Sequence, residues 1–136
     1  MRYLIDSNIW IYAAAGVDCV IQFMNSADLD EWIGYSSISR LEVMGYKDFD
    51  EGQEGKMKRM MSCFNECEIS ASIVDRAIVL RKQRAMKAPD AIIAATALEN
   101  KAVLVTRNAS DFRGIVGLQV IDPFEQPLNP SADGNR

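Results

Sequence analysis

The feature that most constrains the fold is a series of short apolar runs, each followed by a stretch with helical periodicity. The clearest runs are "RYLID" at 2–6, "WIGYSS" at 32–37, "AVLVT" at 102–106 and "LQVID" at 118–122, with a weaker candidate, "CEIS", at 67–70. Continuous apolar runs of this length are typical of strands buried on both faces. Strands that alternate with helices indicate a parallel sheet. We therefore predict an α/β fold with a mainly parallel sheet of four to five strands.

Helical patterns fill most of the intervals between these runs. We expect helices over 7–16 with continuation through 20–27, over 39–46, over 57–64, and over 72–87 leading into a helix that opens near Pro89. The stretch "DFDEGQEGK", residues 48–56, is acidic and contains glycine, so we expect a solvated loop there. The last residues, 125–136, are polar and contain proline, which predicts a disordered tail.

Length and composition are those of one ordinary globular domain. A chain of 136 residues with 49% hydrophobic and 25% charged residues has enough apolar surface for a core. No apolar run approaches the ~20 residues that a membrane-spanning helix needs. The opening segment "MRYLIDSNIW" carries an acid at position 6, unlike a signal peptide. We expect a single domain over 1–124, located in the cytoplasm.

The chain contains no histidine, and this absence excludes several classes of enzyme. Ser-His-Asp and Cys-His nucleophile systems, histidine general bases and histidine-ligated zinc sites are all ruled out. Any catalysis must rest on carboxylates, hydroxyls, lysines or an oxygen-ligated metal. The net charge of −4 argues against a general nucleic-acid binder, although the argument weakens if several acids surround a metal.

Four acidic residues stand where expected strands end or helices begin. Asp6 follows the first strand directly, Glu42 lies early in the helix after the second strand, and Asp111 follows "AVLVT" by a few residues. Asp90 comes just after Pro89 in "KAPDAIIAAT", at the start of an almost wholly apolar helix. Open parallel sheets bind ligands beyond the carboxyl ends of their strands. We therefore expect the four acids at one edge of the sheet.

Each acid also has an ordinary structural explanation. Asp90 suits the positive end of a helix dipole, which is worth about 0.3–1 kcal/mol. Asp6 can cap the first helix, Ser39 with Glu42 matches the S-x-x-E capping box, and Asp111 can be a turn residue. Together, however, the four would crowd carboxylates at one edge, and a divalent cation explains all of them at once. Hard oxygen ligands favour Mg²⁺ or Mn²⁺ over zinc.

Four blocks of the sequence resemble the PIN-domain ribonucleases, and most of all the VapC-type toxins of bacterial and archaeal toxin–antitoxin pairs. In family order the blocks are "LIDSNIWIY", "SISRLEVMGY", "KAPDAIIAATAL" and "LVTRNASDF". The similarity covers residues 2–124 and implies a three-layer α/β/α PIN-like fold. The chain departs from the family pattern with Ser7 where threonine is commoner, Lys101 where glycine is frequent, and "DP" at 122–123 where "NP" is usual.

The resemblance implies a metal-dependent endoribonuclease. The catalytic, metal-binding acids would be Asp6, Glu42, Asp90 and Asp111, with Mg²⁺ as the ion and Mn²⁺ as a substitute. The supporting residues would be Ser7, Ser39, Thr106 and Asn108. A metal-activated water would hydrolyse the phosphodiester bond and leave 5′-phosphate ends. The implied partners are an RNA substrate, a cognate antitoxin and a second copy of the chain in a homodimer.

The basic segment "RKQRAMK", residues 81–87, precedes the Asp90 block. At helical spacing, Ile73, Ala77 and Leu80 form an apolar line that Arg84 continues. We therefore expect Arg81 and Arg84 to emerge from the core near Asp90 and to bind RNA phosphates. The alternative is a solvated helix end, where cations favour the carboxyl terminus.

Three other functions fit part of the pattern. A response-regulator receiver also gathers acids and Mg²⁺ at strand ends, but it needs a lysine after a late strand, where this chain has Arg107. A non-catalytic PIN-like module would bind RNA or a partner without needing all four acids. A structure-specific DNA nuclease of the same fold would need an additional arch, for which 136 residues leave little room.

Overall fold

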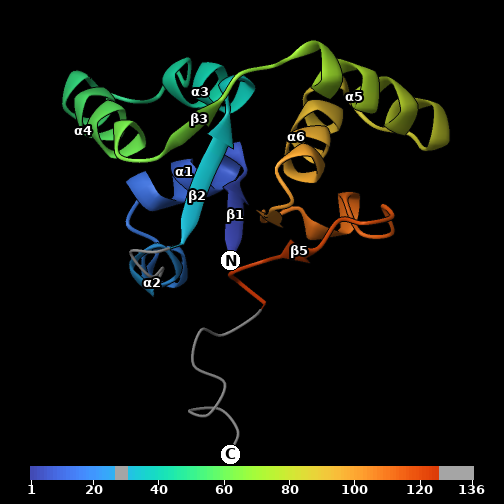
Figure 1. The fold of residues 1–136 in the computed structure, drawn as a ribbon. Coiled ribbons are helices and arrows are strands. Elements are labelled where there is room, and N and C mark those ends of the chain that lie inside the picture. Colours follow the sequence, from blue (N-terminus) through green and yellow to red (C-terminus); the bar gives the residue numbers. More distant parts are fainter. Residues whose placement is uncertain (27–30, 126–136) are drawn as a thin grey trace, which may run out of the picture.

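The computed structural model describes residues 1–26 and 31–125, which form three layers around one parallel sheet (Figure 1). The strands are β1 (Arg2–Ile5), β2 (Trp32–Ser36), β3 (Asn65–Cys67), β4 (Val103–Val105) and β5 (Val120–Ile121). They lie in the order β3-β2-β1-β4-β5, and every pair of neighbours is parallel. The predicted α/β fold with a parallel sheet is therefore confirmed, with five strands in the described part of the chain.

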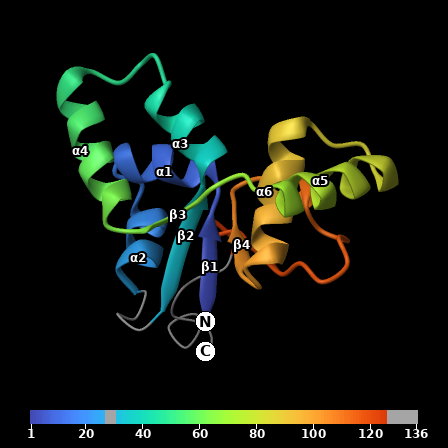
Figure 2. The same cartoon turned by 45° about the horizontal axis from the view of Figure 1, so that its top comes forward.

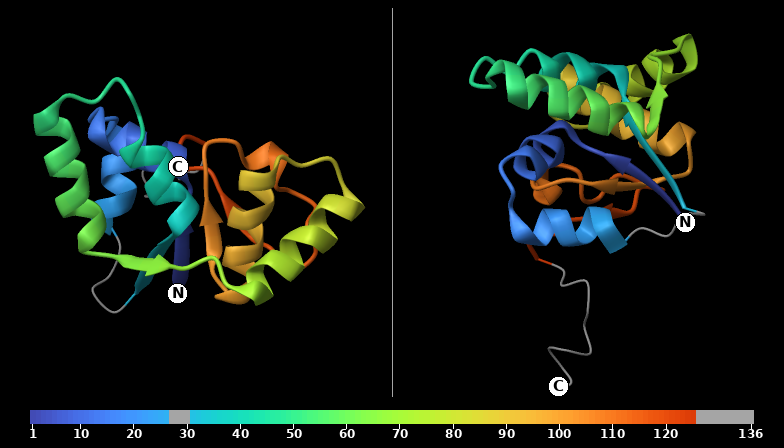
Figure 3. Two further views of the ribbon diagram at one scale, coloured as in Figure 1. Left: turned by 90° about the horizontal axis from the view of Figure 1, so that it is seen from above. Right: turned by 90° about the vertical axis from the view of Figure 1, so that its left-hand side faces the viewer.

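Helices cover both faces of this sheet. They are α1 (Ser7–Ala14), α2 (Asp18–Ser26), α3 (Ser37–Met44), α4 (Glu51–Ser62), α5 (Ala71–Gln83) and α6 (Ala88–Glu99), with a short 3-10 turn, η1 (Ala109–Asp111). Helices α1, α2 and α4 pack on one face, and α5 and α6 pack on the other (Figure 3). No helix of the described residues combines the length and apolarity needed to cross a membrane.

Adjacent residues of the central strands enter different cores. Leu4 and the neighbouring Leu104 face α5 and α6, whereas Ile5 and Val105 face α1, α2 and α4. All four side chains are completely buried. Successive side chains of a strand point to opposite faces, so a strand covered on both sides needs apolar residues throughout. This explains why the strands appear in the sequence as continuous apolar runs.

The order of the strands reverses between β1 and β4. The chain passes from β1 to β2 and β3 in one direction, then crosses through α5 and α6 to β4 on the other side of β1 (Figure 2). Open parallel sheets bind ligands beyond the carboxyl ends of the strands at such a reversal. The residues that stand there are Asp6, directly after β1, and Thr106, directly after β4.

The prediction of a solvated loop at 48–56 is wrong for residues 51–56, because α4 begins at Glu51. Asp50 caps this helix: its carboxylate accepts from the Gln53 backbone N–H at 2.7 Å, and the Gln53 side chain accepts from the Asp50 backbone N–H at 3.0 Å. Met57 and Met61 of the same helix are buried. The reciprocal cap and these anchors outweigh the helix-weakening effect of the glycines.

The continuous helix expected over 72–87 ends at Gln83. Arg84 has an extended backbone (φ −155°, ψ 158°), and α6 begins at Ala88 with Pro89 in its first turn. Proline is compatible with a helix start but not with a helix interior, so the two helices are separate. Ile73, Ala77 and Leu80 are buried as predicted. Arg84 does not continue their line, because it lies beyond the helix.

Two turns use the left-handed backbone region. Gly16 (φ 76°) separates α1 from α2, so the helix expected at 7–16 does not run on into the segment 20–27. Lys101 follows α6 with φ 51°. Glycine adopts this conformation without steric cost, which explains why glycine is frequent at that position in the resembling family.

Two other predictions concern the position of β3 and the tail of the chain. The strand expected at 67–70 lies slightly earlier, at Asn65–Cys67. Of the tail expected at 125–136, the structure describes only Glu125, which forms an ion pair with Arg113 at 3.1 Å. The other tail residues, 126–136, and residue 27 of the expected second helix lie outside the described residues.

The cap of α4 can be tested by Asp50→Ala, with Asp48→Ala as the matched control. Asp48 is exposed and precedes the cap by two residues. We expect Asp50→Ala to lower the free energy of unfolding by about 0.5–2 kcal/mol, since the first turn loses its acceptor. Chemical denaturation measures both variants. Equal stability of the two variants would contradict a contribution from the cap.

Candidate active site

Asp6 lies at the reversal of strand order and is only 5% exposed. Its Oδ1 accepts from the Ser7 backbone N–H at 2.7 Å, which makes it the cap of α1, and its Oδ2 accepts from the Thr106 hydroxyl at 2.7 Å. Burial raises its pKa to about 6, although both hydrogen bonds act to lower it. The negative charges of Asp90 and Glu42 raise the pKa of Asp6 further.

Glu42 is connected to Asp6 through Ser7, whose backbone N–H donates to Asp6 and whose hydroxyl bonds to Glu42. This hydroxyl donates to Glu42 Oε1 at 2.6 Å, and it lies 3.0 Å from the hydroxyl of the buried Ser39. The expected capping box of Ser39 and Glu42 is wrong. The cap of α3 is Ser36, whose Oγ accepts from the Ile38 N–H at 3.1 Å. Glu42 therefore has no capping role, and its carboxylate bonds to α1 instead.

Asp90 stands in the first turn of α6 and is partly buried. Burial raises the pKa of Asp90, the charges of Asp111 and Glu42 raise it further, and Lys87 lowers it. Asp90 and Asp111 share a pocket of about 280 Å³ between the α5–α6 connection and η1. Its lining consists of Arg84, Ala85, Met86, Lys87, Asp90, Ser110 and Asp111.

Thr106 connects the buried acid to the turn that carries Asp111. Its hydroxyl donates to Asp6 and accepts from the Asn108 backbone N–H at 3.0 Å. A hydroxyl that bonds the N–H two residues later is a common local turn device. The side chain of Asn108 forms no capping hydrogen bond with η1. The Thr106 hydroxyl thus orients the Asp6 carboxylate and the start of the turn together.

The four predicted acids share one electrostatic neighbourhood. The pKa of Asp6 responds to Asp90 and Glu42, and the pKa of Asp90 responds to Asp111 and Glu42. Within residues 1–26 and 31–125, none of the four forms an ion pair with lysine or arginine. Nor does any group of three or more acids or cysteines among those residues stand ready to hold a metal ion.

These observations fit a hard divalent cation as the missing positive charge. All the donors are oxygens, which suits Mg²⁺ or Mn²⁺. The like charges that add to burial in raising the pKa of Asp6 and of Asp90 repel less when a cation binds between them. Asp6 offers the strongest argument, because a buried carboxylate without a cation partner is costly.

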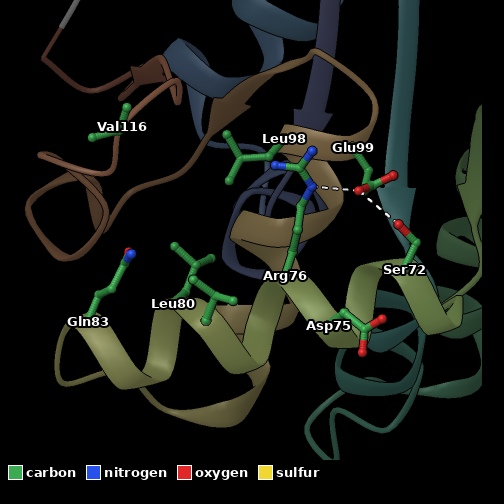
Figure 4. Close-up of a pocket in the computed structure, with 9 residues that line it drawn as sticks. Ser72, Asp75, Arg76, Leu80, Gln83, Leu98, Glu99 and Val116 are labelled. Atoms are coloured by element: carbon green, nitrogen blue, oxygen red, sulfur yellow. Dashed lines mark hydrogen bonds and ion pairs between the residues drawn. The ribbon is translucent and has the colours of Figure 1, made fainter.

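A larger pocket, of about 550 Å³, shares no lining residue with the acidic site (Figure 4). It lies between α5, α6 and Val116, and Figure 4 shows Arg76 of α5 reaching Glu99 of α6. Ser72 donates a hydrogen bond to the same carboxylate at 3.0 Å. The Glu99 charge is thus already neutralised, and this pocket offers no group of unpaired acids like that around Asp6.

The two arginines expected to bind RNA are both bonded to backbone carbonyls. Arg84 Nη1 donates to the Arg113 carbonyl at 2.9 Å, and Nη2 donates to the Asp111 carbonyl at 3.1 Å. Arg81 Nε donates to the Met86 carbonyl at 3.2 Å. Arg84 also lines the pocket of Asp90 and Asp111, although it lies beyond the helix whose apolar line it was expected to continue. RNA binding by either arginine stays a prediction.

Sequence reasoning missed one buried acid near the site. Asp122 is 1% exposed, accepts from the Phe124 N–H at 2.9 Å and forms an ion pair with Arg107 at 3.1 Å. The Arg107 guanidinium also lies 4.2 Å from the centre of the Phe124 ring. This pairing balances the buried charge of the aspartate in "DP". The sequence signal that could have revealed this ion pair is position, because Arg107 and Asp122 follow the neighbouring strands β4 and β5.

Comparison with known proteins identifies the family. The PIN domain model matches residues 3–117, which include all four acids. The chain belongs to the PIN-domain family. No curated protein sequence is similar enough to the chain to count as a match.

Solved structures similar to this PIN-domain chain come from toxin–antitoxin complexes. A chain of a toxin–antitoxin complex from Klebsiella pneumoniae is 38% identical, with a TM-score of 0.75 over 89% of this chain and 97% of that chain. A chain of VapBC2 from Rickettsia felis, bound to a promoter DNA fragment, is 24% identical with a TM-score of 0.78, over 90% and 98% of the two chains. A chain of VapBC-1 from Haemophilus influenzae is 24% identical with a TM-score of 0.76, over 91% and 99%. These likenesses confirm the resemblance to VapC-type toxins and the three-layer PIN-like fold.

Thr106→Val tests whether the Thr106 hydroxyl tunes Asp6. The variant keeps the side-chain shape but removes a hydrogen bond that lowers the pKa of Asp6, so that pKa should rise. If Asp6 serves catalysis as a carboxylate, we expect activity to fall about 10–100-fold, as on loss of other groups that orient metal ligands. The acid limb of the pH–rate profile should move to higher pH. Thr106→Ser is the control and should have wild-type activity and a wild-type acid limb. An unshifted pH–rate profile for Thr106→Val would exclude the tuning role.

Asp90→Asn tests the repulsion at the site through stability. The pKa of Asp90 is raised in the folded state, so folding disfavours its charged form. This lowers the free energy of unfolding at high pH. The loss of stability vanishes once pH falls below the pKa of Asp90 in the unfolded state. We therefore expect the metal-free variant to melt above metal-free wild type at pH 8, with the difference disappearing near pH 3.

The matched control for Asp90→Asn is Asp18→Asn. Asp18 is an exposed acid in the first turn of α2, so it has the helix dipole but not the acidic neighbours. Its replacement should cost about 0.3–1 kcal/mol. A metal-free Asp90→Asn variant that behaves like Asp18→Asn and melts below wild type would favour the dipole explanation for Asp90.

Proposed function

We propose that this PIN-domain protein is a metal-dependent endoribonuclease that acts in the cytoplasm as the toxin of a type II toxin–antitoxin pair. The single observation that carries the proposal is Asp6, which is buried at the reversal of strand order without a cation partner in the described residues and whose raised pKa reflects burial first and then the charges of Asp90 and Glu42. Carboxylates whose pKa is raised, as for Asp6 and Asp90, at a fold's ligand-binding edge are typical of a functional site rather than of a structural one.

In this proposal the metal-binding residues are Asp6, Glu42, Asp90 and Asp111. Mg²⁺, or Mn²⁺ in its place, would supply positive charge for the phosphate and would lower the pKa of the attacking water. Ser7 and Thr106 orient the two oxygens of Asp6, and the Ser7 hydroxyl also orients Glu42. Ser39 and Asn108 support these hydroxyls through the contacts described above.

The residues available determine which bond would break. Without histidine, the chain has no imidazole to deprotonate a ribose 2′-hydroxyl, as metal-free ribonucleases do. Water is then the nucleophile: its oxygen bonds to phosphorus, the bond from phosphorus to the 3′-oxygen breaks, and that oxygen takes up a proton. The products carry a 5′-phosphate and a 3′-hydroxyl.

The partners in this proposal are RNA, a cognate antitoxin and a second copy of the chain. The antitoxin is supported by the similar chains, which come from toxin–antitoxin complexes. A homodimer follows from the resemblance to the VapC-type toxins. Leu41 of α3 and Ile78 of α5 are large apolar side chains with 68% and 47% of their surface exposed, and they provide apolar surface for such contacts.

The proposal is tested with RNA, divalent metal and Asp6→Asn. We expect wild type to cleave RNA with Mg²⁺ or Mn²⁺, to stop in excess EDTA, and to leave 5′-phosphate ends. Asp6→Asn should reduce the rate by at least about 100-fold, the upper end of the effect of removing outer-shell groups. Asp75→Asn, an exposed acid of α5, is the matched control and should cleave at the wild-type rate.

Two outcomes would contradict the proposed activity. Equal cleavage in EDTA, or products with cyclic phosphate ends, would exclude the metal-water mechanism. Wild type that binds RNA or a partner but cleaves nothing with any divalent metal would favour the alternative, a non-catalytic PIN-like binding module.

A further inference from the structure

Arg84 bridges two segments that are far apart in sequence. It stands between α5 and α6, and its guanidinium donates through separate nitrogens to the carbonyls of Asp111 and Arg113. In the described part of the chain, no backbone N–H donates to either carbonyl outside regular elements. The forked guanidinium is suited to bridging two acceptors in a fixed geometry. Arg84 therefore holds the main chain of the turn that contains Asp111.

The contacts of Arg84 are not those of a counter-charge. Among the described residues it forms no ion pair with a carboxylate. The cation that lowers the pKa of Asp90 is Lys87, not Arg84. Since the partners of Arg84 are neutral carbonyls, its effect on the acidic site passes through the position of the backbone.

The turn that Arg84 contacts is buried on one side and exposed on the other. Its apolar residues Ala109, Phe112 and Ile115 are buried in the protein, which anchors one side of the turn. Asp111 and Arg113 alternate with these anchors and are exposed. The turn then passes through Gly114 in the left-handed region (φ 91°). Only the bonds from Arg84 tie the carbonyls of these two exposed residues to another element of the described structure.

We propose that Arg84 is a positioning residue that fixes the turn 109–114, and with it Asp111, beside Asp90. The inference rests on the proposed function, because it assigns a task to Asp111 in the metal site. It differs from the sequence prediction for Arg84, in which the guanidinium binds RNA phosphates. The shared pocket of Arg84, Asp90 and Asp111 is where a displaced turn would alter the distance between the two acids.

The test compares Arg84→Met, which keeps the apolar stem, with Arg84→Lys, which keeps a charged donor. Lys82→Gln is the matched control. It removes the same charge as Arg84→Met, but from an exposed residue in the last turn of α5. Three quantities are measured for each full-length protein: backbone hydrogen exchange in 109–114, Mn²⁺ affinity, and RNA affinity as a function of salt.

For Arg84→Met we expect faster exchange confined to 109–114 and a Mn²⁺ affinity that falls about tenfold, the lower end of the effect of removing groups that orient metal ligands. Arg84→Lys should recover part of the protection from exchange and part of the Mn²⁺ affinity, since an ammonium also donates to carbonyls. Lys82→Gln should match wild type in exchange and Mn²⁺ affinity. The salt slope of RNA binding should be the same for Arg84→Met and Lys82→Gln.

Unchanged exchange and unchanged Mn²⁺ affinity in Arg84→Met would overturn the inference. So would a flatter salt slope for Arg84→Met than for Lys82→Gln with normal Mn²⁺ affinity, because that result assigns Arg84 to RNA phosphates. Failure of the proposed function is recognised separately. A wild type that binds Mn²⁺ but cleaves no RNA contradicts the nuclease activity, while the exchange and Mn²⁺ data still decide the role of Arg84.

Discussion

The hydrogen bond between Asp6 and Thr106 joins the two strands that meet at the centre of the molecule. The backbone N–H of Asp6 donates to Val105 at 2.9 Å, and its carboxylate accepts from Thr106 at 2.7 Å, so backbone and side chain make the same connection. Because Asp6 also caps α1, its orientation fixes a strand pair and a helix start together. Ser7 of the same helix then bonds to Glu42, so the second acid is positioned by the helix that Asp6 caps.

Two buried aspartates of this edge differ in how their charge is balanced. Asp122 has Arg107 as an ion-pair partner and accepts a backbone N–H, which is the usual arrangement of a structural carboxylate. Asp6 has donors for its oxygens but no ion-pair partner among the described residues, and burial raises its pKa, with a further increase from the charges of Asp90 and Glu42. The contrast within one sheet edge is the physical reason for assigning a ligand to Asp6 and not to Asp122.

The sequence was sufficient for the features that depend on periodicity and strand position. Apolar runs predicted the parallel sheet, and the carboxyl-end rule predicted acids near Asp6, whose pKa is raised by burial and further by the charges of Asp90 and Glu42. It was insufficient where one local contact outweighs composition, as in the Asp50 cap of a glycine-containing helix. The role of Ser36 as the cap of α3 could not be recognised from the sequence, because no acid follows it three residues later. The carbonyl contacts of Arg84 depend on a turn whose path no periodic pattern specifies.

The position of β1 has a consequence for biosynthesis. It is synthesised before the other described strands, yet it is the central strand, and its neighbour β4 is synthesised about a hundred residues later (Arg2–Ile5 against Val103–Val105). Until then one edge of β1 lacks its partner, and the Asp6 carboxylate lacks the Thr106 hydroxyl. The surroundings of Asp6 are therefore completed only after β4 and Thr106 have been synthesised, and a nascent or truncated chain that stops before β4 contains Asp6 without the hydroxyl that orients it.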